Sequence, residues 1–104
     1  MSKSQQWKEA ERELARDMGG TRTGPRGFGL PDVIHPRWAP EIKYGEQRWF
    51  TAQLLKDIKQ AETNAKGMPW FVYLREKITG RRFVVVPYKD FIRLLKLENE
   101  QYER

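Results

Sequence analysis

The fold is decided by residues 31–43, which read PDVIHPRWAPEIK. Apolar and β-branched residues interleaved with polar ones predict two short strands, at 32–35 (DVIH) and 40–44 (PEIKY). Pro36 opens the intervening PRWA segment (36–39) and Pro40 follows it, and prolines in such positions are typical of a turn. We therefore expect a β-hairpin in this part of the chain.

The expected hairpin brings two carboxylates together. Asp32 opens the first strand and Glu41 lies in the second, so the turn can place the two side chains next to each other. Because strand side chains alternate between faces, Glu41 and Lys43 share one face while Ile42 points into the core. Neighbouring carboxylates raise each other's proton affinity unless a cation lies between them, and oxygen ligands suit Mg²⁺ or Mn²⁺. With a lysine to hold phosphate or to orient and deprotonate water, these are the parts of a metal-assisted phosphodiester hydrolase.

Upstream of the hairpin, the spacing of apolar residues predicts a helix from about Gln5 to Met18, stopped by two glycines. Glu11 falls in the stripe with Trp7 and Leu14, on the side of the helix that faces the core. A carboxylate there is costly unless it is paired or bound to a metal ion. Glu11 is therefore either part of a site, or a residue at the edge of the stripe that pairs with an arginine or reaches water.

The remaining segments supply more helices and a second pair of strands. They are a basic, glycine-rich loop at 19–31 with a short strand near 21–23, helices at 51–66 and 88–104, and strands at 68–76 and 81–87 around a turn at 77–80. The order α-β-β-α-β-β-α indicates an α/β protein in which helices flank a mixed β-sheet.

Composition narrows the class of protein. With 104 residues and 38% hydrophobic residues, the chain is expected to form a single domain over 1–104. Twenty basic against 14 acidic residues give a net charge of +6, which suits a polyanion such as nucleic acid, although a charge that serves only solubility is the alternative. The absence of cysteine excludes disulfides, thiolate zinc sites and cysteine nucleophiles, and a single histidine excludes a multi-histidine metal site.

No apolar run of signal-peptide type opens the chain, and none approaches the length of a spanning helix. We therefore expect a protein that acts in the cytoplasm, with no membrane partner.

The segment AERELARDMGGTR (10–22) and the pattern PD…EIK resemble the PD-(D/E)xK nuclease superfamily, and within it the archaeal-type Holliday junction resolvases and small phage-encoded relatives. The first looks like the family's first helix and the arginine after it, and the second like its catalytic hairpin. The later helix and two strands also follow the family's order. The resemblance therefore covers most of the chain and implies a restriction-endonuclease-like core.

The resemblance also implies roles for individual residues. It makes Glu11, Asp32, Glu41 and Lys43 catalytic, and it makes Glu11, Asp32, Glu41 and the main-chain carbonyl of Ile42 the ligands of Mg²⁺ or Mn²⁺. Arg12 matches the arginine beside the helix glutamate, and Arg22 the basic residue after the helix. With Arg26 in the glycine-rich loop, these arginines are the expected DNA contacts.

The expected function is a magnesium-dependent DNA endonuclease, most specifically a Holliday junction resolvase. A four-way junction offers two equivalent strands for cutting, so a twofold homodimer would supply the matching pair of sites. The turn between Asp32 and Glu41 is shorter than in archaeal members and rich in proline, which leaves a nicking or other structure-selective nuclease open. A DNA-binding module of the same fold without turnover is the alternative from another class, and a phage origin fits the small size.

For several further residues, a functional role competes with an ordinary structural one. His35 is expected to be an ordinary hydrogen-bonded or exposed residue outside the site. The aromatic pairs at 49–50 and 70–71 could stack on unpaired bases, but a core or dimer interface is favoured for them. The basic residues around the 77–80 turn serve phosphate contact or solubility; they are Arg75, Lys77, Arg81 and Arg82.

Overall fold

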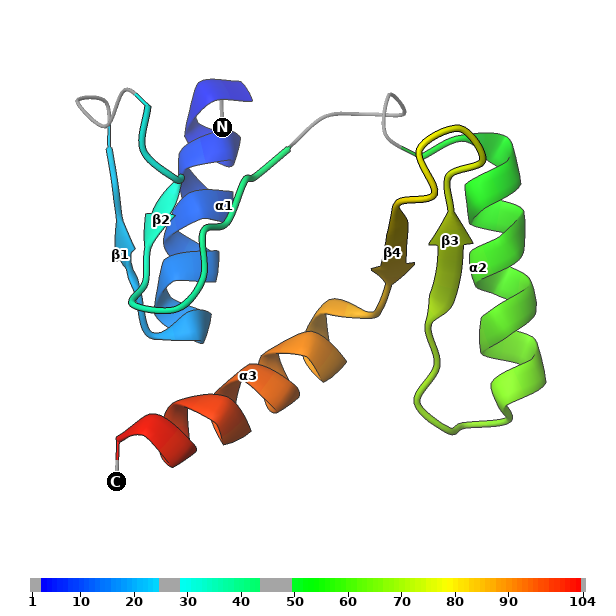
Figure 1. Cartoon of the computed structure of the whole chain (residues 1–104). Coiled ribbons are helices and arrows are strands. Elements are labelled where there is room, and N and C mark those ends of the chain that lie inside the picture. The colour runs from blue at the N-terminus through cyan, green and yellow to red at the C-terminus, as the bar shows by residue number, and fades with distance from the viewer. Residues whose placement is uncertain (1–2, 25–28, 44–49, 104) are drawn as a thin grey trace. The chain divides into compact units, whose positions relative to one another are not determined.

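A computed structural model describes residues 3–24, 29–43 and 50–103 (Figure 1). These residues form three helices and two small antiparallel sheets, which confirms the α/β class. The chain divides into two compact units, residues 1–45 and 46–104, and each is described by itself. No helix among the described residues is both long and apolar enough to cross a membrane.

The first unit opens with helix α1 (Lys3–Met18), which the apolar spacing predicted to within two residues at its start. Its inner side buries Ala15 and Met18. Gly19 takes a positive φ of 74°, the Gly20 amide donates to the Ala15 carbonyl at 2.8 Å, and the Gly19 amide donates to that of Arg16 at 3.4 Å. This is the Schellman arrangement, which closes a helix and turns the chain back along it.

Two very short strands follow, β1 (Thr21–Arg22) and β2 (Val33–Ile34), and they pair antiparallel with Arg22 opposite Val33. Both strands pack against α1. Val33 is completely buried. A β-carbon added at Gly20 would lie 2.6 Å from the Ile34 carbonyl oxygen and 2.7 Å from Cγ1 of Val33, so the helix and sheet approach at a distance that only glycine permits.

The expected strand at 40–44 is wrong for residues 40–43, which form no ladder, and residue 44 lies outside the described part of the chain. Instead, β2 pairs with the short strand in the glycine-rich segment. Two features explain this. Pro40 has no N–H to donate to a ladder, and the Ile42 amide donates to the Asp32 side chain instead of to a strand carbonyl.

The second unit begins with α2 (Ala52–Ala65), where the Thr51 hydroxyl caps the helix by accepting from the Leu54 amide at 3.1 Å. The chain then forms β3 (Val72–Arg75) and β4 (Arg82–Val85), which pair antiparallel, and ends in α3 (Tyr88–Tyr102). All four elements were predicted. The four described strands pair as two separate antiparallel sheets, whereas the sequence predicts one mixed sheet.

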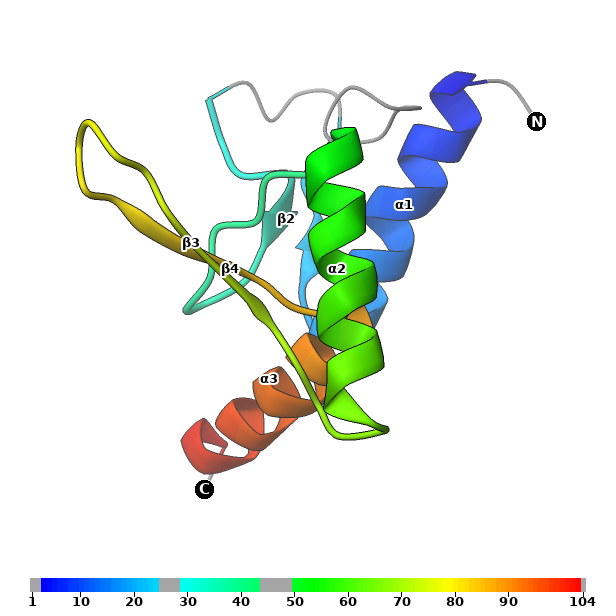
Figure 2. The ribbon, with the colours of Figure 1, turned by 90° about the vertical axis from the view of Figure 1, so that its right-hand side faces the viewer.

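The β3–β4 pair runs as an arm that ends in the turn at 77–80 (Figure 2). At its end, the Glu76 carboxylate accepts the amides of Ile78 at 2.7 Å and Thr79 at 2.5 Å, and it also accepts the Thr79 hydroxyl. The Thr79 hydroxyl first, and then the amides of Thr79 and Ile78, lower the pKa of Glu76 below its usual value. A single side chain therefore organises this turn.

Candidate functional site

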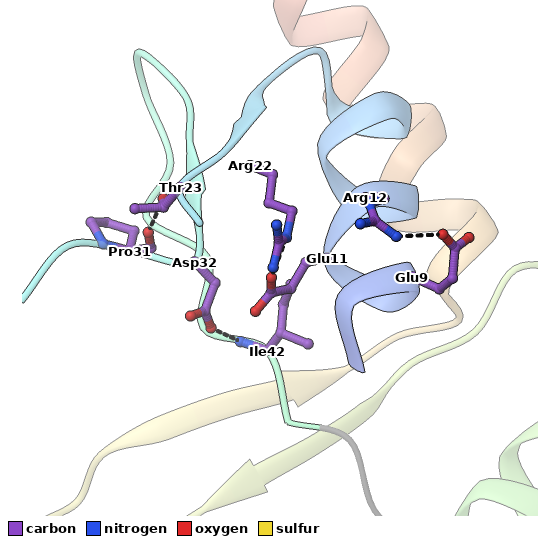
Figure 3. A network of polar contacts seen from close by, with 8 residues as sticks. All are labelled: Glu9, Glu11, Arg12, Arg22, Thr23, Pro31, Asp32 and Ile42. Atoms are coloured by element: carbon purple, nitrogen blue, oxygen red, sulfur yellow. Dashed lines mark hydrogen bonds and ion pairs between the residues drawn. The ribbon is translucent and has the colours of Figure 1, made fainter. Parts of the chain in front are cut away.

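Asp32 lies at the entrance of β2 and is bonded twice to the segment that carries the Glu-x-Lys motif (Figure 3). Its amide donates to the Pro40 carbonyl at 3.0 Å, and its Oδ2 accepts from the Ile42 amide at 2.6 Å. Glu41 lies between the two residues that are bonded to Asp32. The turn therefore brings the backbone on both sides of Glu41 to Asp32, although a side chain replaces part of the expected ladder, and the meeting of the two carboxylates stays a prediction.

The Glu-x-Lys segment alternates as a strand would, even though it is not one. Ile42 is buried, while Glu41 and Lys43 are exposed. The Lys43 Nζ lies 3.2 Å from Oε1 of Glu41, which shows that the two side chains share a face. Because the Ile42 side chain is anchored inside and its amide is held by Asp32, the acid and the lysine are presented outward from a fixed backbone.

Glu11 forms an ion pair with Arg22 on β1. The Nε of Arg22 lies 2.6 Å from Oε2 of Glu11, and the side chains of Arg22 and Glu11 are only 24% and 13% exposed. The two side chains meet between α1 and the segment that bears Asp32 and Ile42 (Figure 3). Of the interpretations for this inward glutamate, the pairing with an arginine is confirmed.

The oxygen donors near Asp32 suit a hard divalent cation in their chemistry. Ile42 uses one oxygen of the Asp32 carboxylate, which leaves the second as a donor atom, and Glu41 and the Ile42 carbonyl supply further oxygens. Glu11 fits less well, because the guanidinium on its Oε2 is largely shielded from water and would oppose a second positive charge, whereas the Lys43 ammonium beside Glu41 is half exposed and screened by water. Within the ranges that the structure describes, no group of three or more histidine or acidic side chains is already gathered to hold a metal ion.

The other predicted residues lie apart from this cluster. Arg12 pairs with Glu9 at 2.9 Å on the outside of α1, where their side chains are 55% and 58% exposed. Arg26 lies outside the described residues. His35 accepts a hydrogen bond on Nδ1 from the Arg37 amide at 3.1 Å, as expected of an ordinary polar residue.

The basic residues of the β3–β4 arm are all on the surface. Arg75, Lys77, Arg81 and Arg82 are exposed, and the Arg81 guanidinium lies 5.5 Å from the centre of the Phe83 ring.

Phe50 and Phe71 are 47% and 61% exposed, so a core role is wrong for both, while their expected role in a dimer interface stays a prediction. Trp49 lies outside the described residues.

Two features of the site were missed from the sequence. One is the Ile42 amide as the partner of Asp32, for which no residue pattern exists because every residue except proline has an amide. The other is the choice of Arg22 as the partner of Glu11. The Gly19-Gly20 pair was the available signal, because a glycine-closed helix returns the chain along its own surface within a few residues.

Comparison of the chain with protein-family models, with curated proteins and with solved structures finds no match.

Proposed function

We propose that this protein is a metal-dependent DNA endonuclease with a restriction-endonuclease-like core, and most specifically a Holliday junction resolvase that acts as a homodimer. One observation carries the proposal. The Asp32 carboxylate is hydrogen bonded to the Ile42 amide at 2.6 Å, which ties one acid to the backbone between a second acid and a lysine that share an exposed face. The resemblance of PD…EIK to the PD-(D/E)xK nucleases supports the same assignment of these residues.

Asp32, Glu41 and the carbonyl of Ile42 would hold Mg²⁺ or Mn²⁺. When bound, the cation supplies positive charge to a phosphoryl oxygen and lowers the pKa of a water molecule. The exposed position of Glu41 and Lys43 leaves room for a polymer backbone to reach them.

Lys43 acts on the phosphate or on the attacking water. Its ammonium lies 3.2 Å from Glu41, at the edge of the proposed cation site. From there it can orient the water and stabilise the negative charge that develops on the phosphoryl group. Because the Ile42 amide is held by Asp32, the neighbouring Lys43 starts from a fixed backbone position near its place of action before the substrate arrives.

DNA is the proposed polyanion because the chain carries a net charge of +6 and the described surface holds many exposed arginines and lysines. A junction has two strands to cut symmetrically, and this chain offers one proposed site, so a twofold dimer gives two. We place the activity in the cytoplasm and propose a phage origin, which the resemblance to small phage-encoded relatives supports.

A non-catalytic DNA-binding module is the second candidate. It is favoured by the Glu11–Arg22 ion pair, because Glu11 is one of the expected metal ligands and its carboxylate is instead bound to an arginine. Such a module would bind DNA equally well with and without a divalent cation.

The test is cleavage of an end-labelled four-way junction and of a matching linear duplex, each in Mg²⁺ and in EDTA, on a denaturing gel. Paired symmetric cuts in the junction alone, lost in EDTA, are expected of the resolvase. Cuts in both substrates would reassign the protein as a broader nuclease. Binding without cuts in either condition would favour the binding module.

A further inference from the structure

We propose that Glu11 is a positioning residue whose carboxylate holds the Arg22 guanidinium in place to grip a DNA phosphate, and that it does so without a metal ion. The inference rests on the proposed DNA-binding function and assigns Glu11 a different part in it. The resemblance implies a metal ligand at this position, whereas the geometry points to a part-buried support for an arginine.

The contact is made by one atom of the guanidinium. Arg22 donates through Nε to Oε2 of Glu11 at 2.6 Å, a short, charge-assisted hydrogen bond. A guanidinium carries five N–H donors in a rigid fork. The terminal nitrogens, which have no other partner among the described residues, therefore keep their donors for an anion, and about a quarter of the side chain's surface remains open to one.

The pair is held by rigid elements at both ends. Glu11 lies in the middle of α1, and Arg22 lies in β1 opposite the fully buried Val33. The Schellman turn at Gly19 and Gly20 joins the helix to the strand directly. An arginine fixed in this way loses less rotamer entropy when it binds, which is how preorganisation raises affinity.

The same helix carries a comparison pair of the same chemistry. Arg12 and Glu9 also form an ion pair, at 2.9 Å, but both side chains are more than half exposed. Exposed pairs of this type are screened by water and hold their side chains only weakly. The burial of Glu11 and Arg22, and not the mere presence of a pair, is therefore what predicts a positioning role.

Phosphate is the anion that this arrangement fits. A guanidinium matches the oxygens of a phosphate in bidentate fashion, and the net charge of +6 draws the chain to a polyanion. A divalent cation on Glu11 would instead have to share the carboxylate with a guanidinium in contact with it. The same pair therefore favours an anion on its arginine over a cation on its glutamate.

The test is a double-mutant cycle on DNA affinity, measured by fluorescence anisotropy with a labelled four-way junction in EDTA. Glu11→Asp and Arg22→Lys keep every charge but shorten the carboxylate or remove the fork. Each single variant is expected to weaken DNA binding by about tenfold. The double variant is expected to bind DNA no more weakly than the weaker-binding single variant, because the pair acts as a unit. Glu9→Asp, the matched change in the carboxylate of the exposed pair, is expected to leave affinity within about twofold.

Metal binding is the second measurement. Glu11→Gln removes the charge from the bond to Arg22, so it is expected to weaken DNA binding in EDTA by about tenfold, while its affinity for Mn²⁺, measured by calorimetry, stays that of the wild type. Circular dichroism melts check that each variant is folded, and Glu11→Gln and Arg22→Lys carry the test if Glu11→Asp is not.

Two results would overturn the inference: loss of Mn²⁺ affinity in Glu11→Gln, or additive effects of Glu11→Asp and Arg22→Lys on DNA affinity. Failure of the proposed function looks different. A wild-type protein that binds the junction in EDTA but never cuts it in Mg²⁺ removes the nuclease and leaves the Glu11–Arg22 inference standing. A wild-type protein that binds no DNA removes both.

Discussion

At the scale of single residues, the three side chains around Ile42 differ in how much the fold depends on them. Asp32 holds a backbone amide, while Glu41 and Lys43 are exposed and form an ion pair with each other. A change at either exposed residue should therefore alter chemistry without altering the fold, whereas a change at Asp32 alters both.

We expect Glu41→Ala and Lys43→Ala to keep the wild-type circular dichroism spectrum and melting temperature. Cleavage should fall to background in Glu41→Ala, and by at least about 100-fold in Lys43→Ala, because charge stabilisation at the phosphate is lost. Asp32→Ala should also lose cleavage and, in addition, lower the free energy of unfolding by about 1–3 kcal/mol, because the Ile42 amide loses its acceptor. Full activity in Glu41→Ala would remove the site from consideration.

Glu76 provides a pH-dependent contribution to stability. The Thr79 hydroxyl and the Thr79 and Ile78 amides lower the pKa of Glu76 in the folded state. The stabilisation is therefore complete above the ordinary glutamate pKa and is lost as pH falls through the lower, folded pKa. The protection of the Ile78 and Thr79 amides against exchange, measured by NMR relative to the intrinsic rate at each pH, should be lost in that acidic window. Glu76→Gln should show fast exchange at neutral pH as well, and unchanged exchange in that variant would contradict the assignment.

At the scale of elements, the close approach of α1 to β2 depends on Gly20. A methyl group there would lie 2.6 Å from a backbone oxygen, which cannot rotate away. We expect Gly20→Ala to lower the free energy of unfolding by about 1–3 kcal/mol through overpacking. Thr21→Ala, one residue along and exposed, serves as the control in urea titrations. Equal stability of the two variants would show that helix and sheet can separate at little cost.

The elements also show which parts of the fold follow from sequence. The helices were predictable because each combines an apolar stripe with a local stop or start, such as Gly19 for α1 and Thr51 for α2. The arm of β3 and β4 was predictable from its dense β-branched and aromatic residues. The pairing of β1 with β2 was not, because strands of two residues carry almost no periodic signal and their partners are chosen by packing on α1.

The candidate site was predictable to a similar degree. Alternation placed Glu41 and Lys43 on one face and Ile42 inside, and this pattern holds without a strand because it depends on extended backbone alone. Burial of a carboxylate predicted a partner for Glu11, but several arginines could have served. The choice of Arg22 depends on where the chain runs after the Schellman turn, which is set by the tertiary structure and not by a local sequence pattern.

At the scale of the whole molecule, the net charge of +6 makes a measurable prediction about DNA binding. Arginines that contact phosphates release counterions, so affinity should fall steeply with salt. If about four phosphates are neutralised, affinity should drop about 100-fold between 50 and 200 mM salt. Binding isotherms across this range in EDTA check the prediction, with a single-stranded oligonucleotide for comparison. A flat salt response would exclude DNA as the partner.

The hydrogen bonds from Asp32 to Pro40 and Ile42 close residues 33–39 into a loop, and the candidate site lies where the two ends of this loop meet. Doubling the length of such a loop costs only about 0.6 kcal/mol, since closure entropy grows slowly with length. New residues spliced in at the exposed Ala39 would therefore extend outward while the acids and the lysine stayed in register. In such an architecture, insertions can change what the loop contacts while the candidate site keeps its geometry.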